Sequence, residues 1–144
     1  MKKEIIKKFL NSWKQGVIEI GKAFQHDGDF KKLAEIFIEK HYAFSEEDVL
    51  FKPTFTSEKV FRNTKADAIS YFVKGDISED KGFALKPWKK ISFSERKTII
   101  FEKNALSMGN YFFQGVDGSD AVKVEYTFGY VKDNDNNLLI NMHH

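Results

Sequence analysis

The chain has 144 residues and no cysteine, which excludes a disulfide framework and thiolate chemistry, and a domain of this length buries enough surface to fold without a metal. Lys and Arg number 23 against 21 Asp and Glu, so the net charge of +2 favours a solvated surface over nucleic-acid binding. Fifteen phenylalanines predict a large aromatic core or a pocket lined by rings.

The N-terminal part of the sequence predicts two amphipathic helices. Apolar residues recur at helical spacing over residues 3–25 and again over residues 30–40, with a break at residues 26–29. The apolar stripe of the first helix is typical of a helix that covers a core. Charged residues interrupt the apolar pairs of residues 1–16, which is not the pattern of a signal peptide, and no run approaches the ~20 apolar residues of a membrane span. We therefore expect a soluble protein without a membrane contact, in the cytoplasm rather than exported.

Residues 49–75 predict one short strand and a third helix. Residues 49–55 are rich in strand-forming residues, but Pro53 interrupts them, so we expect a short edge strand. Thr64 is suited to the N-cap of the next helix, with Asp67 at the reciprocal position. The polar loop that follows contains Ser78-Glu79-Asp80, which we interpret as solvated surface.

The second half of the sequence predicts an antiparallel sheet. Residues 91–93 and 98–101 indicate two strands around a turn at residues 94–97. Residues 105–144 indicate three more strands, because apolar runs are separated by turn clusters at 115–118 and 133–137. The predicted helices lie mainly in the first half of the chain and the predicted strands in the second half. This order predicts a single α+β domain over residues 1–144, with the N-terminal helices on one face of a strongly curved antiparallel sheet.

Strict alternation assigns the faces of the last two strands. From residue 122 to residue 130 one face is apolar and the other carries Glu125 and Thr127. In the final strand, alternation predicts that Ile140 and His144 share one face, whereas His143 lies on the other. We expect His144 to be a packed, hydrogen-bonded core histidine.

The four histidines do not form a metal motif. Adjacent residues of a strand point to opposite faces, so His143 and His144 cannot easily bind one ion together. His26 lies in a predicted turn and His41 at a predicted helix end, and Glu125 could join only one histidine. A zinc site needs at least three protein ligands, so we expect no metal and no cofactor.

Several polar side chains are candidates for chemistry. If the sheet curves into a cone, one of its faces lines a pocket, and Glu125 and Thr127 are then either pocket groups or cross-strand partners. Thr54 and Tyr71 carry hydroxyls that can both donate and accept hydrogen bonds, and each is otherwise an ordinary capping or interface hydroxyl.

Six blocks of the sequence carry a family resemblance: FKPT at 51–54, AISYFVKGD at 68–76, GFALKPW at 82–88, ALSMGNYFF at 105–113, VKVEYTFGY at 122–130 and HH at 143–144. In order and spacing they resemble the small bacterial and algal proteins related to the calcium/calmodulin-dependent kinase II association domain. That family has the cone-shaped NTF2-like (SnoaL-like) fold and includes the iota-class carbonic anhydrases, some of which work without a metal.

The resemblance implies hydration of carbon dioxide to bicarbonate in a hydroxyl-lined pocket, and a homodimer formed through the open sheet face. By this resemblance, Thr54 matches the family position whose hydroxyl lies beside the bound anion, and Tyr71 matches the position that supplies its phenol. These two residues are therefore the catalytic candidates. The family's serine after the histidine pair falls beyond His144, where this sequence stops.

The alternative is a non-catalytic module that binds a small ligand or oligomerises, as the kinase association domain does. A third possibility, a lipophilic-substrate isomerase or cyclase, needs a buried carboxylate base. The remaining pocket candidates are Glu125, Thr127, His143 and His144.

Overall fold

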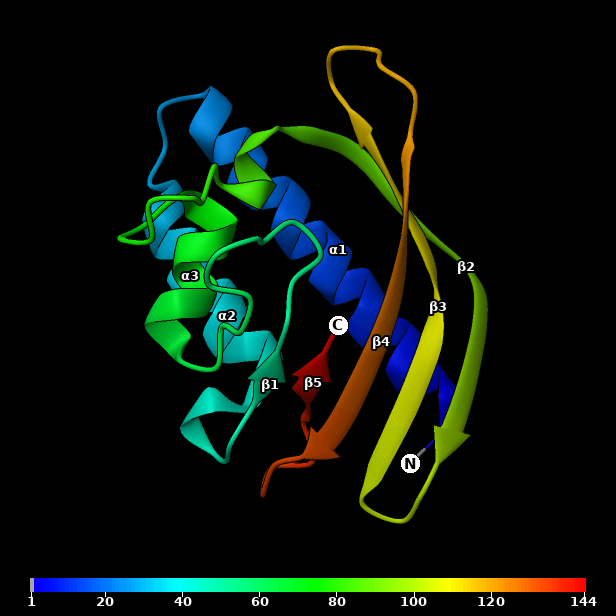
Figure 1. Cartoon of the computed structure of the whole chain (residues 1–144). Helices are drawn as coiled ribbons and strands as arrows, with labels where there is room; N and C mark the ends of the chain where they lie inside the picture. Colours follow the sequence, from blue (N-terminus) through cyan, green and yellow to red (C-terminus); the bar gives the residue numbers. More distant parts are fainter. Residues whose placement is uncertain (1) are drawn as a thin grey trace.

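The computed structural model describes residues 2–144, except for the side chain of Glu95. Two helices come first, a short strand and a third helix follow, and four further strands complete a five-stranded sheet (Figure 1). The helices are α1 (Lys3–Gln25), α2 (Phe30–His41) and α3 (Lys65–Val73), with single 3₁₀ turns η1 (Ala43–Ser45) and η2 (Phe83–Leu85). The strands are β1 (Leu50–Phe51), β2 (Trp88–Ile100), β3 (Asn104–Gly115), β4 (Val122–Lys132) and β5 (Leu138–His143).

The sheet has the strand order β1-β5-β4-β3-β2. Every pairing is antiparallel except that of the edge strand β1, which runs parallel to β5. The predicted α+β class, with N-terminal helices on an antiparallel-rich sheet, is therefore confirmed. Strand β5 lies between β1 and β4 in the sheet (Figure 1).

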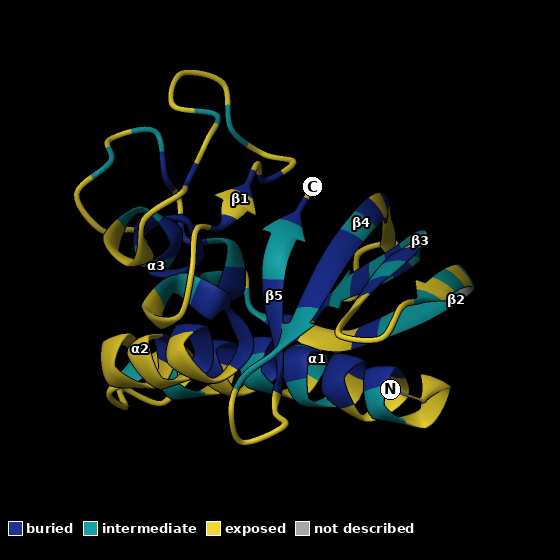
Figure 2. Cartoon of the chain, turned by 90° about the horizontal axis from the view of Figure 1, so that it is seen from below, coloured by how far each residue is buried: buried dark blue, intermediate teal, exposed yellow. Residues whose placement is uncertain are grey.

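Helix α1 packs against the inner face of the curved sheet. Its buried residues include Ile6, Leu10, Trp13 and Val17, which recur every three or four positions and so form one stripe. The buried stripe faces the strands, and the opposite side of the helix is exposed (Figure 2). This packing brings the Trp13 indole into the aromatic core, where it stacks on Tyr111 of β3 at 5.8 Å between ring centroids.

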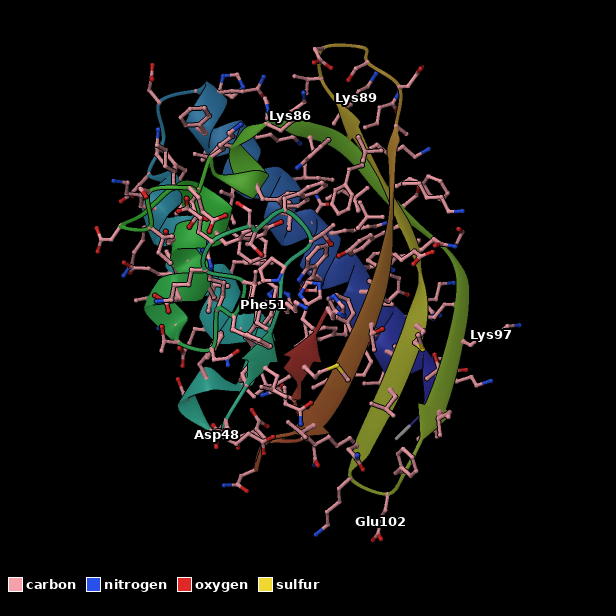
Figure 3. All side chains as sticks on the ribbon, viewed as in Figure 1. Asp48, Phe51, Lys86, Lys89, Lys97 and Glu102 are labelled. Carbon is pink, nitrogen blue, oxygen red and sulfur yellow. The ribbon has the colours of Figure 1, made fainter. Side chains whose placement is uncertain are left out.

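Strand β2 is continuous, so the predicted turn at residues 94–97 is wrong. Ser94 pairs with Asn110 and Lys97 with Met108, which leaves one extra residue on β2 between these two pairs. A β-bulge of this kind bends a strand without ending it. The polar composition that indicates a turn here is instead that of an exposed edge strand, and Lys97 projects away from the molecule (Figure 3).

A second bulge changes the faces of β5. Tyr130 pairs with Ile140 and Gly129 with Met142, so Asn141 is the extra residue. As a result, Ile140 and His143 are both buried, opposite inward residues of β4. The predicted strict alternation is therefore wrong from Asn141 onward.

No helix within residues 2–144 is both long enough and apolar enough to cross a membrane.

Candidate active site

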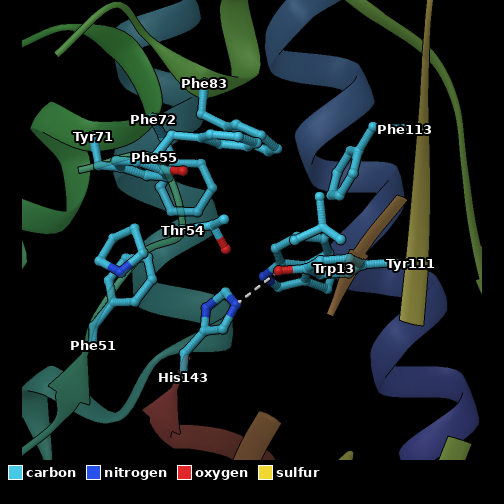
Figure 4. Close-up of a pocket in the computed structure, with 12 residues that line it drawn as sticks. Trp13, Phe51, Thr54, Phe55, Tyr71, Phe72, Phe83, Tyr111, Phe113 and His143 are labelled. Atoms are coloured by element: carbon cyan, nitrogen blue, oxygen red, sulfur yellow. Dashed lines mark hydrogen bonds between the residues drawn. The ribbon is translucent and has the colours of Figure 1, made fainter. Parts of the chain in front are cut away.

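A narrow, partly enclosed cavity lies between the helices and the inner face of the sheet. Its walls are mostly aromatic rings, contributed by α1, β1, α3, η2 and β3 (Figure 4). Thr54, Tyr71, Tyr111 and His143 are the hydrogen-bonding side chains that line it most closely. The space that a water-sized molecule can occupy is about 20 Å³, which is enough for about one water. The cavity therefore suits a very small ligand.

The two residues that the resemblance selected both line this cavity. Thr54 follows Pro53 in the loop after β1, and Tyr71 belongs to the buried side of α3. The Tyr71 ring stacks on Phe83 at 5.7 Å and an interplanar angle of 13°. Burial raises the pKa of Tyr71 above its ordinary value. The phenol is therefore neutral near pH 7 and can donate a hydrogen bond.

His143, rather than His144, is the packed core histidine. Its ring stacks on Phe51 at 4.8 Å and meets the edge of Phe128 at 4.3 Å. Nδ1 lies 2.8 Å from the Tyr42 hydroxyl and Nε2 lies 3.2 Å from the Tyr111 hydroxyl. Burial lowers the pKa of His143 to about 3, so the imidazole is neutral at neutral pH. The bulge at Asn141 is the reason that the prediction chose the wrong histidine.

The other three pocket candidates line a neighbouring open groove. His144 is exposed, and its backbone forms a pair with Thr127, with N–O distances of 2.9 and 2.7 Å. Glu125 lies on the same outward side of β4 and is also exposed. Thr54 lines both the groove and the partly enclosed cavity, so it lies at the boundary between them. The structure thus brings Thr54, Tyr71 and His143 together and leaves Glu125, Thr127 and His144 outside the partly enclosed cavity.

The loop that carries Thr54 is held by the partly buried carboxylate of Glu79. The carboxylate of Glu79 accepts hydrogen bonds from the backbone N–H groups of Ser57, Glu58 and Lys59 at 2.7, 2.9 and 2.7 Å. These bonds, that from Lys59 first, lower the pKa of Glu79 to about 2. The expected solvated surface is therefore wrong for Glu79 and Asp80, which bind the loop to the rest of the fold, whereas Ser78 is exposed as predicted.

Sequence reasoning missed Tyr111, which lines the cavity, and Tyr42, which hydrogen-bonds to His143. Tyr111 pairs with Val124 in the β3–β4 register, so it points to the same inner face as the apolar residues of β4. A hydroxyl at an inward strand position was a usable signal, because a buried phenol needs a partner. Tyr42 follows the end of α2, where no periodicity indicates its contacts.

Within residues 2–144, no group of three or more His, Asp or Glu side chains is arranged to hold a metal ion.

Comparisons with known proteins identify relatives of this chain. A protein-family model described as "Metal-independent carbonic anhydrase" matches residues 4–144. The chain is 36% identical over 138 residues to the metal-independent carbonic anhydrase of Nostoc sp. strain PCC 7120, a match that covers 92% of this chain and 67% of the relative.

Two solved structures have the same fold. The crystal structure of the iota-carbonic anhydrase from a cyanobacterium, complexed with bicarbonate, superposes with a TM-score of 0.95 at 33% identity and covers 100% of this chain and 90% of that chain. An NTF-2 like protein from Shewanella oneidensis superposes with a TM-score of 0.61 at 15% identity, over 100% of this chain and 98% of that chain. At this identity the second similarity concerns the fold alone.

Proposed function

Since the chain belongs to the metal-independent carbonic anhydrase family, we propose that it catalyses the reversible hydration of carbon dioxide to bicarbonate in this cavity and at its boundary with the open groove. The observation that carries the proposal is the cavity itself. It is very small, its walls are aromatic, and its hydrogen-bonding groups are neutral. Carbon dioxide is small and apolar, so it needs such walls rather than a charged binding group.

The reaction needs a positioned water and donors for the charge that develops on the carbon dioxide oxygens. We assign the first task to Thr54, whose hydroxyl can accept from a water and donate to an anion. We assign the second to Tyr71, because its neutral phenol can donate to an oxygen that gains charge. A preorganised donor of this kind in a water-poor site is worth about 2.7–4 kcal/mol of barrier lowering.

The proton of the attacking water must leave the cavity. A phenol with an ordinary pKa near 10 is a poor base, and burial raises the pKa of Tyr71 further. Thr54 lies at the boundary with the open groove, so the proton can pass to bulk water on that side. We propose that the reaction uses no metal, in keeping with the family.

The outer face of the sheet carries exposed apolar side chains that a second copy of the chain could cover. Ile99 and Met108 lie on the outer side of β2 and β3 and are 60% and 62% exposed. Large apolar side chains that cluster at a sheet face favour association. We propose a homodimer that covers this face.

Two other functions have less support. An isomerase or cyclase of this fold needs a free carboxylate in the cavity, but the described residues that line it include no Asp or Glu. The buried carboxylate of Asp80 is already bound to Arg62. The same cavity is also consistent with a non-catalytic module that binds a small ligand. Such a module would differ from the proposed enzyme only in that it does not convert the ligand.

Stopped-flow measurement of carbon dioxide hydration with a pH indicator tests the proposal directly. We expect a rate above that of buffer, unchanged when zinc or manganese is added. A rate equal to buffer under all three conditions would leave the ligand-binding module as the function.

A further inference from the structure

Four buried groups from four parts of the fold form one hydrogen-bonded series that ends at the cavity. The indole Nε1 of Trp13 donates to the Tyr42 hydroxyl at 3.3 Å. The Tyr42 oxygen lies 2.8 Å from His143 Nδ1, and His143 Nε2 lies 3.2 Å from the Tyr111 oxygen. All four residues are at least nine-tenths buried.

The direction of the protons in this series follows from the first donor. An indole N–H can only donate, so the Tyr42 oxygen accepts from Trp13. Tyr42 has one hydroxyl hydrogen, and its remaining hydrogen-bond partner within the described residues is His143. If Tyr42 donates to Nδ1, the hydrogen without a protein acceptor is that of Tyr111, which lines the cavity and can bond a molecule there. In the opposite direction it is the hydrogen of Tyr42, which does not line the cavity and would be buried without an acceptor, an arrangement that proteins avoid.

This direction places the proton of the neutral imidazole on Nε2. Nε2–H then donates to the Tyr111 oxygen. The hydrogen of Tyr111 itself has no acceptor among the described residues, and the residue lines the same cavity as Thr54 and Tyr71. Figure 4 shows the hydroxyls of Thr54 and Tyr111 directed toward the same space, with His143 bonded to Tyr111.

We propose that Tyr111 is a third substrate-binding hydroxyl, which donates to bicarbonate or to the water it is formed from, and that His143 and Tyr42 are positioning residues that fix the direction of this donation. The inference rests on the proposed function for the identity of the ligand.

The series gives the cavity a strong donor without a charge. Consecutive hydrogen bonds polarise one another, so each upstream donor strengthens the Tyr111 O–H as a donor. Burial keeps His143 neutral and raises the pKa of Tyr111. A neutral donor stabilises charge as it develops on the ligand and still releases the anionic product, whereas a buried cation would hold that product tightly.

The first part of the test reads the tautomer of His143 in the wild-type chain by ¹⁵N NMR near pH 7.5. We expect a neutral ring protonated at Nε2 and unprotonated at Nδ1. In Tyr42→Phe, which removes the donor to Nδ1, we expect loss of this single tautomer. A wild-type ring protonated at Nδ1 would overturn the proposed direction.

The second part measures bicarbonate affinity by NMR titration. Tyr111→Phe should raise the Kd roughly tenfold, the effect of one lost hydrogen bond to a charged group. Tyr130→Phe is the matched control, because Tyr130 is equally buried, its hydroxyl has no partner among the described residues, and it does not line the cavity. Its Kd should equal that of the wild type. Equal Kd values for Tyr111→Phe and the control would overturn the role of Tyr111.

Affinity and turnover separate this inference from the proposed function. If the wild type binds bicarbonate more tightly than Tyr111→Phe but does not hydrate carbon dioxide, the inference holds and the proposed function fails. If the wild type is active and Tyr111→Phe retains its bicarbonate affinity, the proposed function holds and the inference fails.

Discussion

Arg62 and Asp80 form a bidentate ion pair inside the fold. Nη1 lies 2.6 Å from Oδ2 and Nη2 lies 2.7 Å from Oδ1, and both side chains are almost completely buried. The Ser70 hydroxyl of α3 also donates to Asp80 at 2.6 Å. This pair connects the loop after β1, which carries Thr54, with the helix that carries Tyr71.

Arg62→Met should therefore lower the free energy of unfolding by about 3–5 kcal/mol, because it leaves the Asp80 carboxylate buried without its cation. Urea denaturation measures this change. Lys32→Met is the control, since it removes an exposed ion pair with Glu35 worth about 0–1 kcal/mol. Equal losses in the two variants would contradict a structural role for the buried pair.

Tyr71→Phe should lower kcat for carbon dioxide hydration by roughly 10²-fold, the effect of removing one preorganised donor to a developing charge. The substitution keeps the ring that stacks on Phe83, so the fold should be retained. Stopped-flow kinetics with circular dichroism as a folding check gives the measurement. Tyr130→Phe should retain the full rate. A fully active Tyr71→Phe together with an inactive His144→Ala would instead locate the chemistry in the open groove.

Exhaustive dialysis against a chelator should leave the hydration rate unchanged if the hydroxyls alone support the reaction. The same preparation should contain less than stoichiometric zinc or manganese in elemental analysis. A rate that disappears on chelation and returns with one metal would refute the metal-free mechanism.

The fold was largely predictable because its main signals are local. The helical stripe through Leu10, Trp13 and Val17 and the alternation along β4 each report the side of an element that faces the core. The bulge at Asn141 was not predictable, because the residue composition does not indicate one extra residue in a strand. The extra residue nevertheless moves every later side chain of the strand to the opposite face of the sheet. For this reason the sequence indicated His144 where the fold buries His143.

The site was predictable only where a family motif pointed to it. Thr54 and Tyr71 lie 17 positions apart on different elements, and no periodicity states that their hydroxyls share a cavity. The burial of Asp80 was equally hidden, since its neighbours are polar and its partner Arg62 lies in another loop. Long-range pairing of polar groups is decided by the packing of the whole chain.

The outer sheet face gives a prediction about association. The chain should elute as a dimer in size-exclusion chromatography with light scattering at micromolar concentration. Met108→Glu should shift it toward the monomer, because it replaces an exposed apolar side chain of the outer sheet face with a negative charge. Leu33→Glu, on the exposed side of α2, is the control and should remain dimeric. A wild-type monomer would contradict the proposed homodimer.

Two buried histidines give a prediction about pH and stability. Burial lowers the pKa of His143 to about 3 and that of His41 to about 4, against an ordinary value of 6.5 in the unfolded chain. Below pH 6.5 the unfolded state therefore binds up to two protons that the folded state does not. Stability is fully present above pH 6.5 and falls as the pH decreases toward 4, with a limiting slope of about 1.4 kcal/mol per pH unit for each histidine.

Urea denaturation between pH 7.5 and pH 5 measures this slope above the range in which carboxylates titrate. In the folded chain His41 Nδ1 lies 2.8 Å from the Phe37 carbonyl oxygen, and Nε2 lies 2.8 Å from the Ser12 hydroxyl. His41→Asn supplies an amide nitrogen in place of Nδ1 and removes one titrating group, so its limiting slope should be about half that of the wild type. A free energy of unfolding that is constant from pH 7.5 to pH 5 would show that the two imidazoles gain protons in the folded state, and so would contradict their burial as neutral rings.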